Sequence, residues 1–375
     1  MPRKNALRKS QAFLSVRTDV LCGVFIPTMR VEKMNDRKKL LTVKNLKKYF
    51  PIKTGFLARN RTFLRAVDGV DLEIYEGETF GLVGESGSGK STFGRTLLRL
   101  YEPTDGQVLF HQEEGETALT DLNIRQMRAF RKDLQIIFQD PYSSLNPRMT
   151  VGQLIAEGAV THGYFKKGSA ALWEYVLGVM RACGLQEHML RRYPHQFSGG
   201  QRQRICIARA LAVKPKFIVC DECVSALDVS IQSQILNLLS ELKEREGLTY
   251  LFISHDLSVV RYISDRIAVM YLGKIVEMGD AEQIFENPRH PYTMALISAA
   301  PNIQAQSTEK ILLEGQLPNP VSPPKGCPFH TRCFYAQEIC QRVPAPVIEV
   351  ENGHFCVCHF SLDSTEMKWK KARKE

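Results

Sequence analysis

One stretch of nine residues organises the chain: Gly84-Glu85-Ser86-Gly87-Ser88-Gly89-Lys90-Ser91-Thr92. It matches the pattern G-x-x-x-x-G-K-[ST] of a phosphate-binding loop. An apolar run, Phe80–Val83, precedes it and a helical pattern, Phe93–Leu98, follows, which predicts a buried strand, a glycine-rich turn and a helix. Glycines let backbone N–H groups turn inward, and the first turn of a helix adds unpaired donors. We therefore expect all nine residues to contact a nucleotide phosphate.

Two side chains of this stretch have chemistry of their own. The ammonium group of Lys90 would reach the β- and γ-phosphates of a nucleoside triphosphate. The Ser91 hydroxyl would ligate Mg²⁺, which prefers oxygen donors. ATP and Mg²⁺ are thus the first expected ligands.

Composition limits the class of protein. With 375 residues the chain has room for two or three domains, and its 44% apolar content is ordinary for a globular protein. The net charge of +10 is concentrated near the two ends, and such basic tails are usually solvated. Their next best partners are anionic lipids or an acidic protein, and we expect no nucleic-acid partner. The best membrane-span candidate, Val20–Met29, has about half the necessary length.

Apolar strand patterns alternate with helical patterns along most of the chain, which predicts an α/β domain with a largely parallel sheet. Residues 145–197 form a helical insert within it. Beyond Pro288 prolines and cysteines become dense, which indicates an appended module. The predicted organisation is a weakly structured extension (1–38), the α/β domain (39–287), a Cys-rich module (288–362) and a basic tail (363–375).

Acidic side chains follow a second predicted strand, Phe217–Cys220. Asp221 at its end would bind Mg²⁺, and Glu222 would activate the attacking water as a general base. Gln139 and His255 each follow a strand of their own; Gln139 would contact Mg²⁺ or the water, and His255 the γ-phosphate or the water. These three side chains, Glu222, His255 and Gln139, are the predicted catalytic residues.

A second anion-binding helix start lies further along the chain. It is formed by Ser198, Gly199, Gly200 and Gln201. A chain with two such sites needs two surfaces that contact phosphate.

In this order, the phosphate loop, Gln139, residues 198–203, the acid pair, Asp228 and His255 resemble the ATP-binding cassette (ABC) family over residues 40–290. The resemblance implies the P-loop NTPase fold of that family, a mostly parallel sheet with an antiparallel subdomain and a helical insert. It implies a head-to-tail dimer in which residues 198–201 contact the partner's ATP. Phe50 takes the place of the aromatic that stacks on adenine, with Tyr49 as a competitor.

Four short stretches resemble the ATPase subunits of dipeptide and oligopeptide importers more closely; they are residues 146–149, 193–196, 290–293 and 317–320. This resemblance implies a peripheral subunit at the cytoplasmic face of the plasma membrane that hydrolyses ATP to drive uptake of peptides or a related small solute. The implied partners are two transmembrane permease subunits, a second ABC ATPase and an extracytoplasmic solute-binding protein.

The alternative is a soluble ABC ATPase of DNA repair or translation. The short distance in sequence from Lys90 to Ser198 leaves no room for the long coiled coil of chromosome-type members. Translation-type members usually carry two cassettes, and one is present here. One departure from the family pattern bears on activity, because Cys223 stands where proline is usual and would loosen the loop that holds Glu222.

The cysteines of the C-terminal region suggest a metal site. Five, six and seventeen residues separate Cys327, Cys333, Cys340 and Cys358. Four thiolates fit zinc or an iron–sulfur cluster, and free thiols are the third possibility. The importer resemblance implies a [4Fe–4S] cluster, with Cys356 as a possible substitute for Cys358 and two histidines, His330 and His359, nearby. The Cys220–Cys223 pair is not expected to bind metal, because the acid pair lies between its members.

Overall fold

The computed structural model describes residues 37–52, 62–300 and 311–361. The predicted N-terminal extension and the basic tail lie almost wholly outside these ranges. The described strands are β1 (Lys39–Ile52), β2 (Thr62–Tyr75), β3 (Thr79–Val83), β4 (Asp105–Gln112), β5 (Gly115–Ala118), β6 (Leu134–Ile137), β7 (Phe217–Asp221), β8 (Thr249–Ile253), β9 (Arg266–Tyr271), β10 (Lys274–Asp280), β11 (Val347–Glu351) and β12 (His354–Val357).

The α-helices of the described ranges are α1 (Lys90–Leu97), α2 (Ile124–Phe130), α3 (Pro141–Ser144), α4 (Val151–Thr161), α5 (Ala170–Ala182), α6 (Gly199–Leu211), α7 (Val229–Glu246), α8 (Leu257–Ile263), α9 (Ala281–Glu286), α10 (Pro291–Ala299) and α11 (Glu338–Arg342). The part of the chain that the structure covers contains no helix with the length and apolar character of a membrane span.

The large sheet has the order β11-β12-β10-β9-β3-β8-β7-β6. The strands from β9 to β6 are parallel, and β9 and β10 form an antiparallel hairpin. A second, antiparallel sheet has the order β2-β1-β4-β5. The mostly parallel sheet of the α/β prediction and the antiparallel subdomain implied by the family resemblance are both confirmed.

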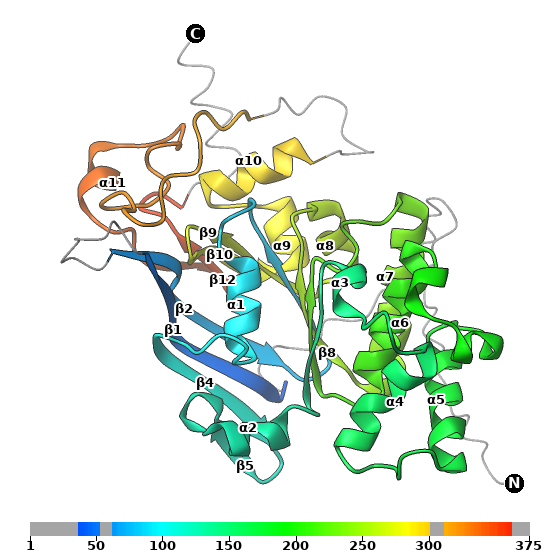
Figure 1. Ribbon diagram of the computed structural model, residues 1–375. Helices are drawn as coiled ribbons and strands as arrows, with labels where there is room; N and C mark the ends of the chain where they lie inside the picture. The colour runs from blue at the N-terminus through cyan, green and yellow to red at the C-terminus, as the bar shows by residue number, and fades with distance from the viewer. Residues whose placement is uncertain (1–36, 53–61, 301–310, 362–375) are drawn as a thin grey trace, which may run out of the picture. The chain divides into compact units, whose positions relative to one another are not determined.

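Helix α1 lies between the two sheets and contacts strands of both (Figure 1). Phe93 and Leu97 are fully or almost fully buried and join the core of the antiparallel sheet. Gly94 allows close packing on the other side, because a Cβ there would come within 2.8 Å of Ile253 Cδ1 and 2.9 Å of Val219 Cγ1. The helix that begins the phosphate site is therefore fixed from two directions.

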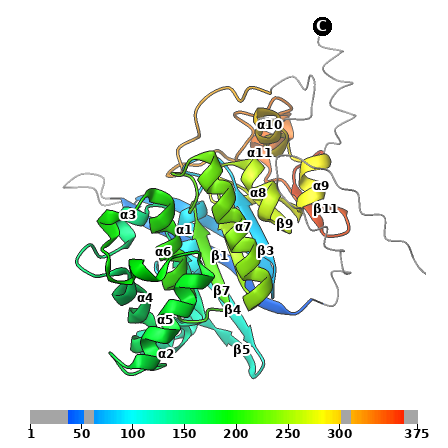
Figure 2. The same ribbon diagram turned by 90° about the vertical axis from the view of Figure 1, so that its right-hand side faces the viewer.

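The helical insert predicted for residues 145–197 contains α4 and α5, which pack with α6 against the edge of the large sheet (Figure 2). Thr150 starts α4 with a reciprocal capping box, because its hydroxyl accepts from Gln153 N and the Gln153 side chain accepts from Thr150 N.

The C-terminal region contributes two strands to the large sheet, which the sequence does not predict. Strand β12 pairs with β10, and β11 pairs with β12. At this junction His354 Nε2 lies 2.8 Å from Glu277 Oε1, and both side chains are fully buried. The backbone N–H groups of Arg289 and His290 also donate to the Glu277 carboxylate. The module boundary at residue 288 stays a prediction.

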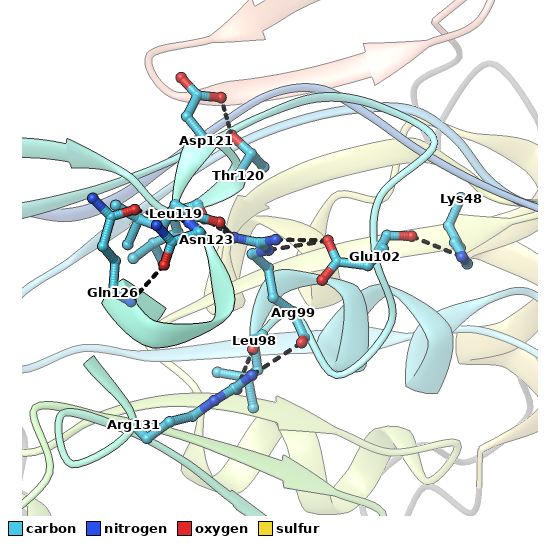
Figure 3. A network of polar contacts seen from close by, with 11 residues as sticks. Lys48, Leu98, Arg99, Glu102, Leu119, Thr120, Asp121, Asn123, Gln126 and Arg131 are labelled. Carbon is cyan, nitrogen blue, oxygen red and sulfur yellow. Dashed lines mark hydrogen bonds and ion pairs between the residues drawn. The ribbon is translucent and has the colours of Figure 1, made fainter. Parts of the chain in front are cut away.

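A polar network closes the far end of α1 (Figure 3). Arg131, just after α2, donates to the carbonyl oxygens of Leu98 (2.6 Å) and Arg99 (3.1 Å). Arg99 in turn donates to the Leu119 carbonyl and pairs with Glu102 at 2.8 Å. Because carbonyls at a helix end lack partners within the helix, Arg131 supplies donors that α1 itself cannot.

We predict that Arg131→Met lowers the free energy of unfolding by about 2 kcal/mol, since two hydrogen bonds from a charged group are lost. Denaturant unfolding of the full chain measures the change. Arg128→Met is the matched control, because Arg128 is exposed in α2, three residues before Arg131. Equal destabilisation by the two variants would contradict the role given to Arg131.

Candidate active site

The predicted site residues follow strands that are neighbours in the parallel part of the large sheet. The phosphate loop follows β3, His255 follows β8, Asp221 ends β7, and Gln139 follows β6. These strands stand in the order β3-β8-β7-β6, so their carboxyl ends meet at one edge of the sheet. Ligands of open α/β sheets bind at this edge.

The phosphate loop depends on its glycines. Gly84 has φ 152°, and a Cβ there would lie 2.2 Å from the Met270 carbonyl oxygen. Gly89 has φ 108°, and its Cβ would lie 2.1 Å from the carbonyl oxygen of Ala66. Backbone from two other strands thus surrounds the loop, and a side chain at either position would displace it.

Lys90 lies across the interior of the loop. Its ammonium donates to the carbonyl oxygens of Gly84 (2.7 Å) and Glu85 (2.9 Å), and the residue is 4% exposed. Burial lowers its pKa, while the nearby carboxylates of Glu222, Asp221 and Glu85 oppose that shift. The loop therefore encloses a cation that anionic phosphate oxygens would stabilise.

Ser91 and Asp221 form an oxygen-donor pair at the start of α1. Ser91 Oγ donates to Asp221 Oδ1 at 2.6 Å, and the Asp221 side chain is 1% exposed. Arg95 Nη2 donates to the other carboxylate oxygen at 3.1 Å. A hydroxyl and a carboxylate at this spacing fit Mg²⁺, which prefers oxygen ligands.

Glu222 is the meeting point of the three predicted catalytic residues. Gln139 Nε2 donates to Glu222 Oε2 at 2.9 Å, and His255 Nδ1 lies 3.4 Å from the same oxygen. These side chains come from three different strands, and the fold brings all of them together.

The backbone of Glu222 is held firmly although Cys223 replaces the usual proline. Glu222 has φ 48°, a conformation uncommon for a residue with a Cβ. Its N–H donates to the Ile253 carbonyl oxygen at 3.0 Å, and its own carbonyl accepts from Ser225 Oγ at 2.9 Å. These bonds fix the turn that aims the carboxylate.

Residues 198–201 begin α6, in the helical group and not beside α1 (Figure 1). Ser198 caps the helix, with its hydroxyl accepting from Gln201 N at 3.4 Å and the Gln201 side chain accepting from Ser198 N at 3.2 Å. A Cβ on Gly200 would lie 2.4 Å from Ile231 Cγ2, so this glycine lets α6 approach α7. The predicted second phosphate-contacting surface thus lies apart from the phosphate loop of its own chain.

The two aromatic candidates for adenine differ in what they contact. The Tyr49 hydroxyl donates to Asp68, and burial raises the pKa of Tyr49 to about 12. Phe50 packs edge-on against Tyr101, with ring centroids 5.5 Å apart. Lys48 Nζ lies 4.8 Å from the Phe50 ring centroid and Arg65 Cζ lies 5.8 Å from that of Tyr49, so both rings have neighbours within this chain.

Four cysteines of the C-terminal region line one small cavity; they are Cys327, Cys333, Cys340 and Cys358. His330 and His359 also line it, whereas Cys356 is not among its lining residues. All four thiols are free. Within the described residues, no group of three or more His, Cys, Asp or Glu side chains has the geometry of a metal-ion site.

Three contacts of the site were not predicted from the sequence. Arg95 binds Asp221 from within α1, and nothing in the helix pattern distinguishes it. Tyr292 and Arg332 of the C-terminal region bind Glu85 of the phosphate loop. The sequence offers one signal for each of these two residues: Tyr292 lies in one of the importer-like stretches, and Arg332 directly precedes Cys333.

Comparisons with known proteins agree with this geometry. A family model described as "ABC transporter" matches residues 67–225, and one described as "Oligopeptide/dipeptide transporter, C-terminal region" matches residues 276–340. The oligopeptide transport ATP-binding protein AppF of Bacillus subtilis (strain 168) is 48% identical over 328 residues, covering 86% of this chain and 98% of AppF. This chain belongs to the ABC transporter ATPases.

Other relatives support the same assignment. The oligopeptide transport ATP-binding protein OppF of Escherichia coli (strain K12) is 50% identical over 329 residues, covering 86% of this chain and 96% of OppF. Among solved structures, the dimeric ATP-binding cassette MJ0796, bound to ADP and phosphate, has a TM-score of 0.56 at 29% identity and covers 64% of this chain and 99% of its own. The ABC ATPase branch with an oligopeptide-transporter C-terminal region is thus the family of this chain.

We predict that Gly89→Ala weakens MgATP binding about a hundredfold, because the new Cβ would displace the loop by more than the tolerance of an oriented site. Gly77→Ala is the matched control: it also has positive φ, 74°, but nothing lies within 4 Å of its Cβ position. Calorimetric titration of both variants measures the difference. Wild-type affinity in Gly89→Ala would contradict the packing of the loop described above.

Proposed function

We propose that this ATPase energises the uptake of oligopeptides or dipeptides, or of a related small solute, through membrane permease partners. The observation that carries the ATPase part of the proposal is the convergence of Gln139 and His255 on Glu222, next to a phosphate loop and an Asp–Ser pair. The relatives named for oligopeptide transport and the matching C-terminal region support the cargo class. They favour transport over a soluble role in DNA repair or translation.

The chain's own groups bind the nucleotide in the proposed mechanism. Residues 84–92 surround the phosphates, and Lys90 exchanges its two carbonyl partners for phosphate oxygens. Phe50 stacks on adenine. Mg²⁺, held by Ser91, Asp221 and Gln139, would neutralise charge on the β- and γ-phosphates. Arg95 keeps the Asp221 carboxylate oriented while Ser91 turns toward the metal.

Glu222 acts as the general base for the attacking water. Its carboxylate is 15% exposed and already accepts from Gln139 and lies beside His255, so its orientation is fixed before substrate arrives. Gln139 and His255 then orient the water and contact the γ-phosphate. Preorganised groups of this kind lower the barrier because they need no rearrangement during the reaction.

A second cassette completes the site. Residues 198–201 lie apart from the loop of their own chain, so they would contact ATP bound to another subunit. The similarity to a dimeric cassette supports this arrangement. The partner is a second copy or a different ABC ATPase, and the two ATPases lie at the cytoplasmic face of the plasma membrane. Two transmembrane permease subunits and an extracytoplasmic solute-binding protein complete the transporter.

The thiol cavity is proposed to hold a [4Fe–4S] cluster. Four cysteine side chains from the described C-terminal segment share one cavity, and thiolates are the ligands of such clusters. Burial raises the pKa of Cys333 to about 12 and also raises the pKa of Cys327 and Cys358. Binding would therefore release protons and cross-link this segment. The segment 288–362 would then form the Cys-rich module of the predicted domain organisation.

We predict that Glu222→Gln lowers ATP hydrolysis at least about a hundredfold while MgATP binding persists, because only the proton acceptor is lost. Hydrolysis and binding are measured separately, on the assembled transporter and on the full chain. Glu244→Gln, an exposed position on α7, makes the same chemical change and should leave both unchanged. Hydrolysis at the wild-type rate in Glu222→Gln would exclude Glu222 as the base.

A cell that carries only the Glu222→Gln allele should also lose ATP-dependent uptake of labelled peptides. Uptake that continues at the wild-type rate would separate this chain from peptide transport. This test addresses the cargo class, whereas the hydrolysis test addresses the catalytic residue.

We predict that protein purified without oxygen contains iron and acid-labile sulfide, and that Cys358→Ser loses both. Cys356→Ser is the matched control, because Cys356 lies two residues away, outside the cavity. Zinc without sulfide in the wild type would count against the cluster, whereas loss of iron from Cys356→Ser alone would make Cys356 the fourth ligand in place of Cys358.

A further inference from the structure

The C-terminal region forms an ion pair with the side chain of Glu85 in the phosphate loop. Arg332 donates two hydrogen bonds to the Glu85 carboxylate, Nη1 to Oε2 at 2.8 Å and Nη2 to Oε1 at 3.1 Å. The Arg332 side chain is 7% exposed and that of Glu85 is 27% exposed. A bidentate pair of this geometry is both stronger and more directional than a single contact. The hydrogen bond to Glu85 also raises the pKa of Arg332.

A second contact holds the backbone of the same residue. The Tyr292 hydroxyl of α10 accepts from Glu85 N at 2.8 Å. Tyr292 is fully buried, and its ring packs 4.8 Å from Tyr271 and 5.3 Å from Phe329. The N–H group of Glu85 is therefore directed to α10, and it is fixed by a rigid aromatic cluster.

These contacts act on the part of the loop that holds Lys90. The Lys90 ammonium binds the Glu85 carbonyl oxygen, so the backbone position of Glu85 sets where the ammonium lies before phosphate oxygens replace that carbonyl. Arg332 has a second effect, because it neutralises the only carboxylate within the stretch 84–92. An unpaired Glu85 would repel the phosphates of ATP.

We propose that Arg332 and Tyr292 are positioning residues that hold the phosphate loop in its nucleotide-binding conformation, so that the C-terminal region sets the affinity for ATP. This inference rests on the proposed function in that the loop binds ATP. It goes beyond that function because it gives the C-terminal region a role in the nucleotide site. Arg332 adjoins Cys333, and Phe329 lines the thiol cavity, so the cavity and the loop share neighbouring contacts.

The test is MgATP binding to the full chain, measured by calorimetric titration of single and double variants. Arg332→Gln should weaken binding about tenfold, the size of a typical coupling between distinct elements. Tyr292→Phe should also weaken MgATP binding, because the hydroxyl that accepts from Glu85 N is lost. Glu85→Gln combined with Arg332→Gln should bind more tightly than Arg332→Gln alone, because the unpaired charge is gone. Arg332→Lys keeps the positive charge but cannot donate two parallel hydrogen bonds to Glu85. Its MgATP affinity should lie between those of the wild type and Arg332→Gln.

Arg289→Gln is the matched control. Arg289 Nη2 pairs with Glu351 at 3.1 Å in the same region but away from the phosphate loop, so its loss should leave MgATP affinity unchanged. Wild-type affinity in both Arg332→Gln and Tyr292→Phe would overturn the inference, as would equal weakening by Arg289→Gln. Absence of MgATP binding by the wild type would instead refute the proposed function.

Discussion

The order of four parallel strands is the constraint on which the site depends. Strands β3, β8, β7 and β6 are neighbours, and the groups that follow them meet at one edge of the sheet. Asp221 reaches Ser91 across this edge at 2.6 Å, and Gln139 reaches Glu222 at 2.9 Å. A shift in register of β7 by one residue would turn Asp221 to the opposite face, because side chains alternate along a strand.

The buried charged side chains at this edge of the sheet are stabilised by hydrogen bonds and an ion pair. Asp221 is almost fully buried and accepts from a hydroxyl and a guanidinium, while Lys90 is buried beside two backbone carbonyls. A buried charge without such partners would cost several kcal/mol. Another buried polar pair, Glu277 with His354, lies where the C-terminal strands join the sheet. Polar contacts thus connect the sheet both to its ligand site and to its C-terminal extension.

Local sequence patterns predicted most of the fold. Contacts between residues far apart in the sequence could not be predicted from it. The apolar runs of β3, β7 and β8 and the glycine loop predicted the strands and the phosphate site directly. Gln139, Glu222 and His255 could be chosen because each follows a strand, and parallel strands share an edge. The contacts of Arg332 and Tyr292 with Glu85 span more than 200 residues. Strand β12 pairs with β10 with Cys356 opposite Glu277, and the contact between the Glu277 and His354 side chains spans 77 residues. No local spacing encodes such contacts.

Affinity purification of the tagged full chain from gently solubilised membranes, followed by mass spectrometry, tests the central claim most directly. We expect two polytopic membrane proteins to be recovered together with a cassette ATPase, either a second copy or a distinct subunit. Weakly retained solute-binding protein would then identify the cargo. Recovery of ribosomal or DNA-repair proteins without any membrane protein would contradict the assignment to a peptide importer.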